Sequence, residues 1–153
     1  MMAIEIRQAS MADAPVVAKL VGALLSELSG RPPEPGLEIR AARLLAMTDR
    51  VWGFLAMADG QDAAGVVMLN ECAAIYAGGV FGEITELYVV PALRSQGVAP
   101  RLLAAADRFG EGRGWARLEV GAPSQPAWSR TCDFYLREGF TETGPRLRRL
   151  IAG

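Results

Sequence analysis

The sequence predicts a mixed α/β fold, in which a sheet of about seven strands contains a parallel β-α-β crossover and carries helices on both faces. Two observations predict this fold: an antiparallel meander of apolar strands fills the middle of the chain, and a strand-helix-strand unit follows it. The 153 residues form one predicted domain, residues 1–153. A chain of this length buries roughly two-thirds of the surface that it exposes when unfolded.

The chain opens with a predicted strand and two predicted helices. Residues 4–8 alternate apolar and polar side chains as a half-buried strand does, and Ser10 followed by Asp13 indicates a helix N-terminus. Between residues 16 and 28 the apolar side chains recur every three or four positions, until a glycine and a proline-rich loop end the helix. Residues 37–47 predict a second, shorter helix.

Three strands are predicted to form the meander. Strands at 51–58 and 65–75 are separated by residues 59–62, which place Asp and Gly where a hairpin turn favours them. After a second turn at 77–79, the strand at 81–90 is rich in residues that fit a pleated surface, and it stops at a proline. The meander therefore ends close to residue 90.

The second half of the chain continues with a helix and a parallel strand. The helix begins near Gly97 and runs to a pair of glycines, after which residues 116–120 form a short apolar strand. Residues 126–137 predict another helix. Two terminal strands, at 140–142 and 147–151, complete the predicted sheet.

The composition indicates a soluble globular protein and excludes several kinds of site. Apolar residues make up 51% and charged residues 22% of the chain, and the net charge of -1 does not favour nucleic-acid binding. No leader or membrane-length apolar stretch is present, which predicts a cytoplasmic protein. The absence of histidine excludes Ser-His-Asp and Cys-His catalysis and histidine zinc sites, so we expect no metal. Cys72 and Cys132 are predicted to be two thiols rather than a disulfide.

The most informative segment joins the strand at 81–90 to the helix that begins near Gly97. Gly97 and the small Ala99 leave backbone N–H groups unshielded at a helix N-terminus, where the helix dipole also attracts an anion. Arg94 can add charge-assisted hydrogen bonds to a phosphate. The segment has neither Gly-Lys-Ser/Thr nor Gly-x-Gly-x-x-Gly, which excludes the common nucleoside triphosphate and dinucleotide loops.

The pattern Arg-x-x-Gly-x-Ala after Leu-Tyr-Val-x-Pro resembles the acetyl-CoA signature of the GNAT superfamily of N-acetyltransferases. The resemblance spans the chain, because residues 4–7 are similar to the family's first strand and residues 134–140 to its later Tyr-x-x-x-Gly-Phe segment. It implies a twisted, mostly antiparallel sheet, acetyl-CoA as the co-substrate and no metal. The implied function is acetyl transfer to a primary amine of a small molecule or peptide.

The resemblance also implies which residues bind the co-substrate. The strand that ends at Val90 would pair with the pantetheine arm through its backbone, and the loop after it would wrap the pyrophosphate. Pro100 has no N–H and removes one donor that the family's loop often presents. The implied residues are Leu87, Tyr88, Val89, Arg94, Ser95, Gln96, Gly97, Val98 and Ala99.

The resemblance and the strand pattern together suggest the acid and the base. Tyr135 stands four residues before Gly139, where the family's tyrosine approaches the CoA sulfur, and is the candidate general acid. Strand alternation puts Glu83 on the same face as Leu87 and Glu86 on the other, unless a bulge inverts the pattern. We prefer Glu83 as the base over Glu86, with Glu119 as a third possibility.

Several alternatives stay open at this level. The family often has an asparagine before the tyrosine helix, and Ser124 or Gln125 are the polar residues that could replace it. The acceptor site is expected within residues 22–48 and 70–82, without a charge pattern that identifies the amine. A homodimer through residues 140–151 is expected from the family. The alternative function is an inactive acyl-CoA-binding regulatory or interaction domain.

Overall fold

The computed structural model describes residues 3–59, 62–123 and 127–152. The chain divides into two compact units, Met1–Val120 and Gly121–Gly153. The first unit contains the sheet and three α-helices, and the second contains one α-helix followed by an irregular segment.

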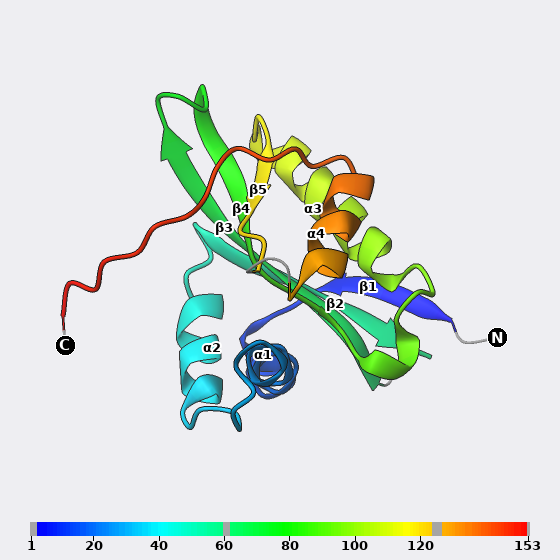
Figure 1. The fold of residues 1–153 in the computed structure, drawn as a ribbon. Helices are drawn as coiled ribbons and strands as arrows, with labels where there is room; N and C mark the ends of the chain where they lie inside the picture. The colour runs from blue at the N-terminus through cyan, green and yellow to red at the C-terminus, as the bar shows by residue number, and fades with distance from the viewer. Residues whose placement is uncertain (1–2, 60–61, 124–126, 153) are drawn as a thin grey trace. The chain divides into compact units, whose positions relative to one another are not determined.

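The sheet of the first unit has five strands in the order β1-β2-β3-β4-β5 (Figure 1). All neighbouring strands are antiparallel except β4 and β5, which are parallel and joined by the crossover helix α3. This arrangement is the predicted meander followed by a β-α-β unit. The strands are β1 (Ile4–Gln8), β2 (Val51–Ala58), β3 (Asp62–Ala74), β4 (Gly79–Val89) and β5 (Leu118–Val120).

Helices cover both faces of this sheet, as predicted. The helices are α1 (Ala14–Ser29), α2 (Leu37–Leu45) and α3 (Val98–Arg113), with short 3-10 turns η1 (Met11–Asp13) and η2 (Pro91–Leu93). Side chains of α1 and α2 share one buried cluster with alternate residues of β2, β3 and β4. The opposite face carries α3, where Phe109 contacts the rings of Trp52 and Phe54 at centroid distances of 4.8 and 5.6 Å.

The cluster under α1 holds that helix against the sheet. Each fully buried Val, Leu or Met side chain contributes roughly 1.5–3 kcal/mol relative to an exposed one, so the cluster is a major part of the core. Its members are Ala14, Val17, Leu20, Leu45, Val51, Leu55, Met57, Val66, Met68 and Tyr88.

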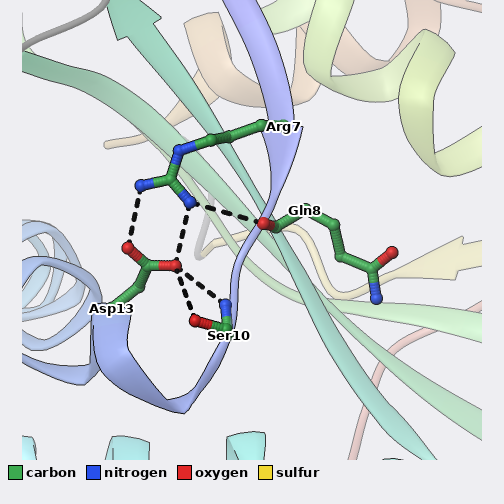
Figure 2. A network of polar contacts seen from close by, with 4 residues as sticks. All are labelled: Arg7, Gln8, Ser10 and Asp13. Carbon is green, nitrogen blue, oxygen red and sulfur yellow. Dashed lines mark hydrogen bonds and ion pairs between the residues drawn. The ribbon is translucent and has the colours of Figure 1, made fainter.

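A network of polar contacts fixes the start of α1 (Figure 2). The two carboxylate oxygens of Asp13 accept hydrogen bonds from the Nη1 and Nη2 atoms of Arg7 at 2.9 and 2.8 Å. One of them also accepts from the backbone N–H of Ser10 at 2.8 Å. The hydrogen bonds from Arg7, more than any other contact, lower the pKa of Asp13 to about 2. The helix therefore begins where Ser10 and Asp13 predicted it.

Trp115 fixes the position of β5 beside β4. A side chain at Gly82 would place its Cβ 2.3 Å from the Trp115 ring, and one at Gly110 would place it 2.7 Å away. The indole N–H donates to Glu71 at 2.6 Å, and Glu71 also accepts two hydrogen bonds from Arg113 at 2.8 and 3.0 Å. The two glycines thus make room for an aromatic ring that holds the crossover against β4.

The second unit differs from the sequence-based expectation. Helix α4 (Ser129–Arg137) forms within the predicted range, but the strands predicted at 140–142 and 147–151 are absent from the described residues, so the sheet has five strands instead of seven. Gly144 has a φ of 123°, and the residue after it is a proline, which donates no ladder hydrogen bond. Leu147 and Ile151 are more than 90% exposed. These two apolar side chains are therefore not packed as a half-buried strand would pack them.

Most remaining predictions agree with the structure within a few residues. Helix α2 is two residues shorter than predicted at its end, and β5 has three residues instead of five. Residues 60–61 of the first predicted turn lie outside the described residues. Cys72 and Cys132 are half-buried thiols, as predicted in preference to a disulfide. None of the described helices is long and apolar enough to span a membrane.

Candidate active site

The outer edge of β4 changes its pairing halfway along the strand. Strand β5 pairs only with residues 82–84 of β4, whereas β3 pairs with β4 as far as Val89. The N–H of Val90 donates to Ala64 beyond the end of β3, so backbone alternation directs the N–H groups of Leu87 and Val89 toward the other edge. No described strand pairs with that edge after residue 84. Among the described residues, this edge therefore lacks a neighbouring strand.

A β-bulge lies where this change occurs. Met68 of β3 pairs with Glu86, and the next residue, Leu69, pairs with Ile84. Thr85 is therefore an extra residue on β4, and its hydroxyl donates to the Glu86 carboxylate. An extra residue shifts the alternation of the strand by one position.

The bulge brings the candidate bases to one face of the sheet. Glu83 pairs with Asn70 and Glu86 with Met68, and cross-strand partners share a face. Both glutamates therefore lie on the face that carries α1, and Leu87 lies on the face that carries α3. Simple alternation would put Glu83 with Leu87 and opposite Glu86, but the bulge that was named as the exception is present and inverts this pattern.

Glu119, the third candidate base, lies on the same face of the sheet as Glu83 and Glu86. Glu119 pairs with Glu83 across the parallel β4-β5 ladder, which puts its side chain on the same face. Its carboxylate forms an ion pair with Arg117 at 2.9 Å. The Arg117 guanidinium also lies 5.0 Å from the ring centroid of Tyr76, in a cation-π contact. Glu119 is thus paired with a cation.

The loop between η2 and α3 exposes a row of backbone donors. Within the described part of the first unit, nothing accepts a hydrogen bond from the N–H groups of residues 95–99. Ser95 and Gly97 have φ values of 62° and 82°, which turn the chain so that these groups converge ahead of the helix. Gly97 is the N-cap of α3 and has no side-chain cap, and no atom lies within 4 Å of a Cβ built on it. The loop therefore fits an anion such as a pyrophosphate.

The side chains of the loop do not all point toward that anion site. The Gln96 amide donates to the carbonyl of Ala92 at 3.3 Å, which braces the turn. Arg94 donates from Nε to the Val89 carbonyl at 2.9 Å and from Nη2 to Glu27 of α1 at 2.7 Å. The charge of Arg94, which was expected to face a phosphate, is thus paired with a carboxylate. Val98 and Ala99 form the first turn of α3, which continues through Pro100.

Tyr135 lies on the buried side of α4 in the second unit. Its ring makes edge contacts with Phe134 and Phe140 at centroid distances of 5.4 Å each. Burial raises the pKa of its hydroxyl to about 12. The phenol therefore stays protonated throughout the neutral range and can donate a hydrogen bond. Ser124 and Gln125, offered as replacements for the family's asparagine, lie outside the described residues.

Sequence reasoning did not locate two features of this region. A bulge was named as a possibility, but its position at Thr85 follows from the pairing of β3 with β4, and no residue of β4 marks it. Glu27 lies 67 residues before Arg94 in sequence, so its contact with Arg94 has no local signal. Within residues 3–59, 62–123 and 127–152, no three Cys, Asp or Glu side chains are grouped as a metal site would require.

Comparison with solved structures shows that the fold is a known one. The ribosomal-protein-alanine N-acetyltransferase from Brucella melitensis biovar Abortus 2308 is 23% identical, with a TM-score of 0.75 and coverage of 97% of this chain and 99% of that one. The aminoglycoside N-acetyltransferase AAC(6')-Iy in complex with CoA is 22% identical, with a TM-score of 0.78 and coverage of 99% and 97%. At these identities the likeness concerns the fold.

The family itself is shown by a different comparison. No curated protein sequence matches the chain. The model of the acetyltransferase (GNAT) family matches residues 21–140, a range that contains the glutamates of β4, the loop before α3 and Tyr135. This range is well over half of the chain, so the protein belongs to the acetyltransferase (GNAT) family.

Proposed function

We propose that this protein transfers the acetyl group of acetyl-CoA to a primary amine of a small molecule or peptide by direct attack. Membership of the family makes the chain an acetyl-CoA-dependent acyltransferase. In the proposed reaction the neutral amine attacks the thioester carbonyl, the C–N bond forms, the C–S bond breaks, and CoA leaves as the thiolate. The amine loses its proton to a glutamate or to water.

The observation that carries the proposal is the continuity of two open backbone surfaces. The free edge of β4 from Thr85 to Val89 leads directly to the row of N–H donors at residues 95–99. An extended arm paired with the edge would end in a diphosphate at the N-terminus of α3, where the helix dipole favours negative charge. Acetyl-CoA has this combination of an amide-containing arm and a pyrophosphate.

The same arrangement predicts where the thioester lies. With the pyrophosphate at the loop, the arm runs back along β4 toward Ile84, where β5 ends at Val120. Glu83 and Glu86 flank this point on the face that carries α1. We therefore propose that Glu83 acts as the base, directly or through water, because its pairing with Glu119 places it beside the end of β5.

The choice of base is tested by two neutral isosteres. Glu83→Gln should lower kcat/KM about tenfold at pH 7, because the acceptor is then an ammonium that must be deprotonated. The loss should shrink as the pH approaches about 10, where an ordinary amine loses its proton unaided. Glu86→Gln should change kcat/KM less than threefold. A larger loss in Glu86→Gln would transfer the role to that residue, and no loss in either would leave water alone as the base.

The acceptor and the assembly are the finer parts of the proposal. The structurally similar enzymes are an aminoglycoside N-acetyltransferase and a ribosomal-protein-alanine N-acetyltransferase, so both kinds of amine are suitable first acceptors to assay. The exposed Leu147, Leu150 and Ile151 support the expected homodimer through residues 140–151, which light scattering in solution would measure. A cytoplasmic location stays a prediction.

The function is tested by titration of acetyl-CoA into the purified protein, followed by an assay of free thiol release. We expect a dissociation constant in the micromolar range and thiol release with at least one of an aminoglycoside, a polyamine, an amino acid and a peptide with a free N-terminus. Acetylpantetheine should bind much more weakly, because it lacks the pyrophosphate. Binding without thiol release would favour the alternative of an inactive acyl-CoA-binding domain. No binding of acetyl-CoA would contradict both.

A further inference from the structure

Arg94 connects three elements of the first unit. Its Nε donates to the carbonyl of Val89 at the end of β4, and its Nη2 donates to the carboxylate of Glu27 on α1 at 2.7 Å. The guanidinium also lies 5.3 Å from the ring centroid of Tyr88, in a cation-π contact. The polar contacts of this side chain are thus with the end of β4 and with α1.

Glu27 is held by more than this one contact. It lies in the last turns of α1, and its side chain is 36% exposed. The hydrogen bond from Arg94 is the main cause that lowers the pKa of Glu27, and a hydrogen bond from Tyr88 also lowers it. Glu27 is therefore ionised at neutral pH and neutralises the charge of Arg94. A neutralised guanidinium attracts a pyrophosphate only weakly.

Ser95, which follows Arg94, has a backbone conformation that the contacts of Arg94 help to hold. Ser95 has a φ of 62°, in the left-handed region that non-glycine residues seldom occupy, so the surrounding structure must hold it there. Gly97 also lies in the left-handed region. The loop that presents the N–H groups of residues 95–99 is thus fixed at one end by α3 and at the other by Arg94.

We propose that Arg94 and Glu27 are positioning residues for the acetyl-CoA loop: their ion pair ties the loop to α1 and shapes it, and Arg94 is not a phosphate ligand. This inference rests on the proposed function. Because α1 leads into residues 22–48, where the acceptor is expected, the pair also links the co-substrate loop to the acceptor side. Removal of Glu27 should then weaken acetyl-CoA binding although it removes a negative charge.

The sign of that change separates the two roles of Arg94. If Arg94 bound phosphate, Glu27→Gln would release it for the ligand, reduce the local negative charge and tighten acetyl-CoA binding. If the pair positions the loop, Glu27→Gln should weaken acetyl-CoA binding about tenfold, which is within the usual range for coupling between two sites. The measurement is a calorimetric titration of acetyl-CoA at constant ionic strength, with melting temperature as the check on folding.

Glu34→Gln is the matched control. Glu34 precedes α2, forms a looser ion pair with Arg40 at 3.6 Å, and its side chain is 68% exposed. The substitution removes the same charge without a contact to the loop, so the affinity for acetyl-CoA should stay within about twofold, as expected for an exposed pair.

Arg94→Lys supplies an independent variant. Lysine keeps the charge but cannot donate to Val89 and Glu27 at once, so we expect the same loss as in Glu27→Gln. The double variant should lose no more than either single one, because both remove one interaction. Equal or tighter binding in Glu27→Gln, or full affinity in Arg94→Lys, would overturn the inference while leaving the proposed function intact. Absence of binding in the unmodified protein would instead overturn the proposed function and this inference with it.

Discussion

Gly97→Asp should lower the affinity for acetyl-CoA at least about 100-fold, which is close to 2.7 kcal/mol of binding free energy. Gly97 is the N-cap of α3, and a Cβ built on it points into open space ahead of the helix. A carboxylate there would lie close to the proposed pyrophosphate, and two like charges about 4–5 Å apart repel by roughly 3–4 kcal/mol at an effective dielectric constant near 20. Titration calorimetry measures the change directly.

Two controls separate repulsion from backbone strain and from added charge. Gly97→Asn has nearly the same shape, and both Asn and Asp enter the left-handed region more readily than other side chains, so it should lose only about tenfold. Gly112→Asp adds the same charge near the other end of α3, at an exposed position with no atom within 4 Å of its Cβ, and should change little. Equal losses in the aspartate and asparagine variants at Gly97 would show that no anion binds there.

The geometry of this loop could be predicted from the sequence because it depends on the backbone. Ser95 and Gly97 are adjacent to a helix start that local periodicity reveals, and the donors are N–H groups that every non-proline residue carries. The strand ends just before Pro91 and the helix begins at Val98, so local sequence signals alone predict where these donors lie. The crossover and the helix boundaries followed from the same local signals.

Other parts of the fold depend on contacts between distant residues. At Thr85 the pairing register between β3 and β4 shifts by one residue. This shift moves the Glu83 side chain to the face opposite the one that simple alternation predicts. Leu147 and Ile151 are apolar residues of the kind found in strands. A strand also requires a neighbouring strand to pair with, and residue types alone do not show whether one is present. An arginine at this position of the loop could bind a phosphate, but the guanidinium of Arg94 forms its ion pair with Glu27, which lies far away in the sequence.

Tyr135→Phe should lower kcat about 100-fold with little change in the affinity for acetyl-CoA, if Tyr135 assists departure of the thiolate as the family resemblance implies. The substitution removes one hydroxyl and keeps the ring contacts with Phe134 and Phe140, so the fold should be retained. Steady-state kinetics measure kcat, and titration of acetyl-CoA with a melting curve supplies the control.

The raised pKa of Tyr135 bears on whether it could transfer a proton to the leaving thiolate or only donate a hydrogen bond to it. A phenol of pKa about 12 is a weaker acid than a thiol of pKa about 8.5, so complete proton transfer to the thiolate would be uphill by about 5 kcal/mol. We therefore propose that, if Tyr135 acts on the leaving sulfur, it does so mainly by donating a hydrogen bond, and that solvent supplies the final proton.

The same pKa predicts the alkaline side of the rate profile. The active form is the protonated phenol, which persists below the folded pKa of about 12, so kcat should show no fall from this group up to pH 10. The free energy of unfolding should also decrease at alkaline pH. In the unfolded chain the tyrosine loses its proton from about pH 10 upward, whereas the folded protein keeps it to about pH 12, so the contribution of Tyr135 to stability declines between pH 10 and 12. A descending limb in kcat near pH 8 or 9 that disappears in Tyr135→Phe would contradict the buried, protonated phenol. An unchanged kcat in Tyr135→Phe would remove Tyr135 from the reaction and leave the thiolate to depart without an acid.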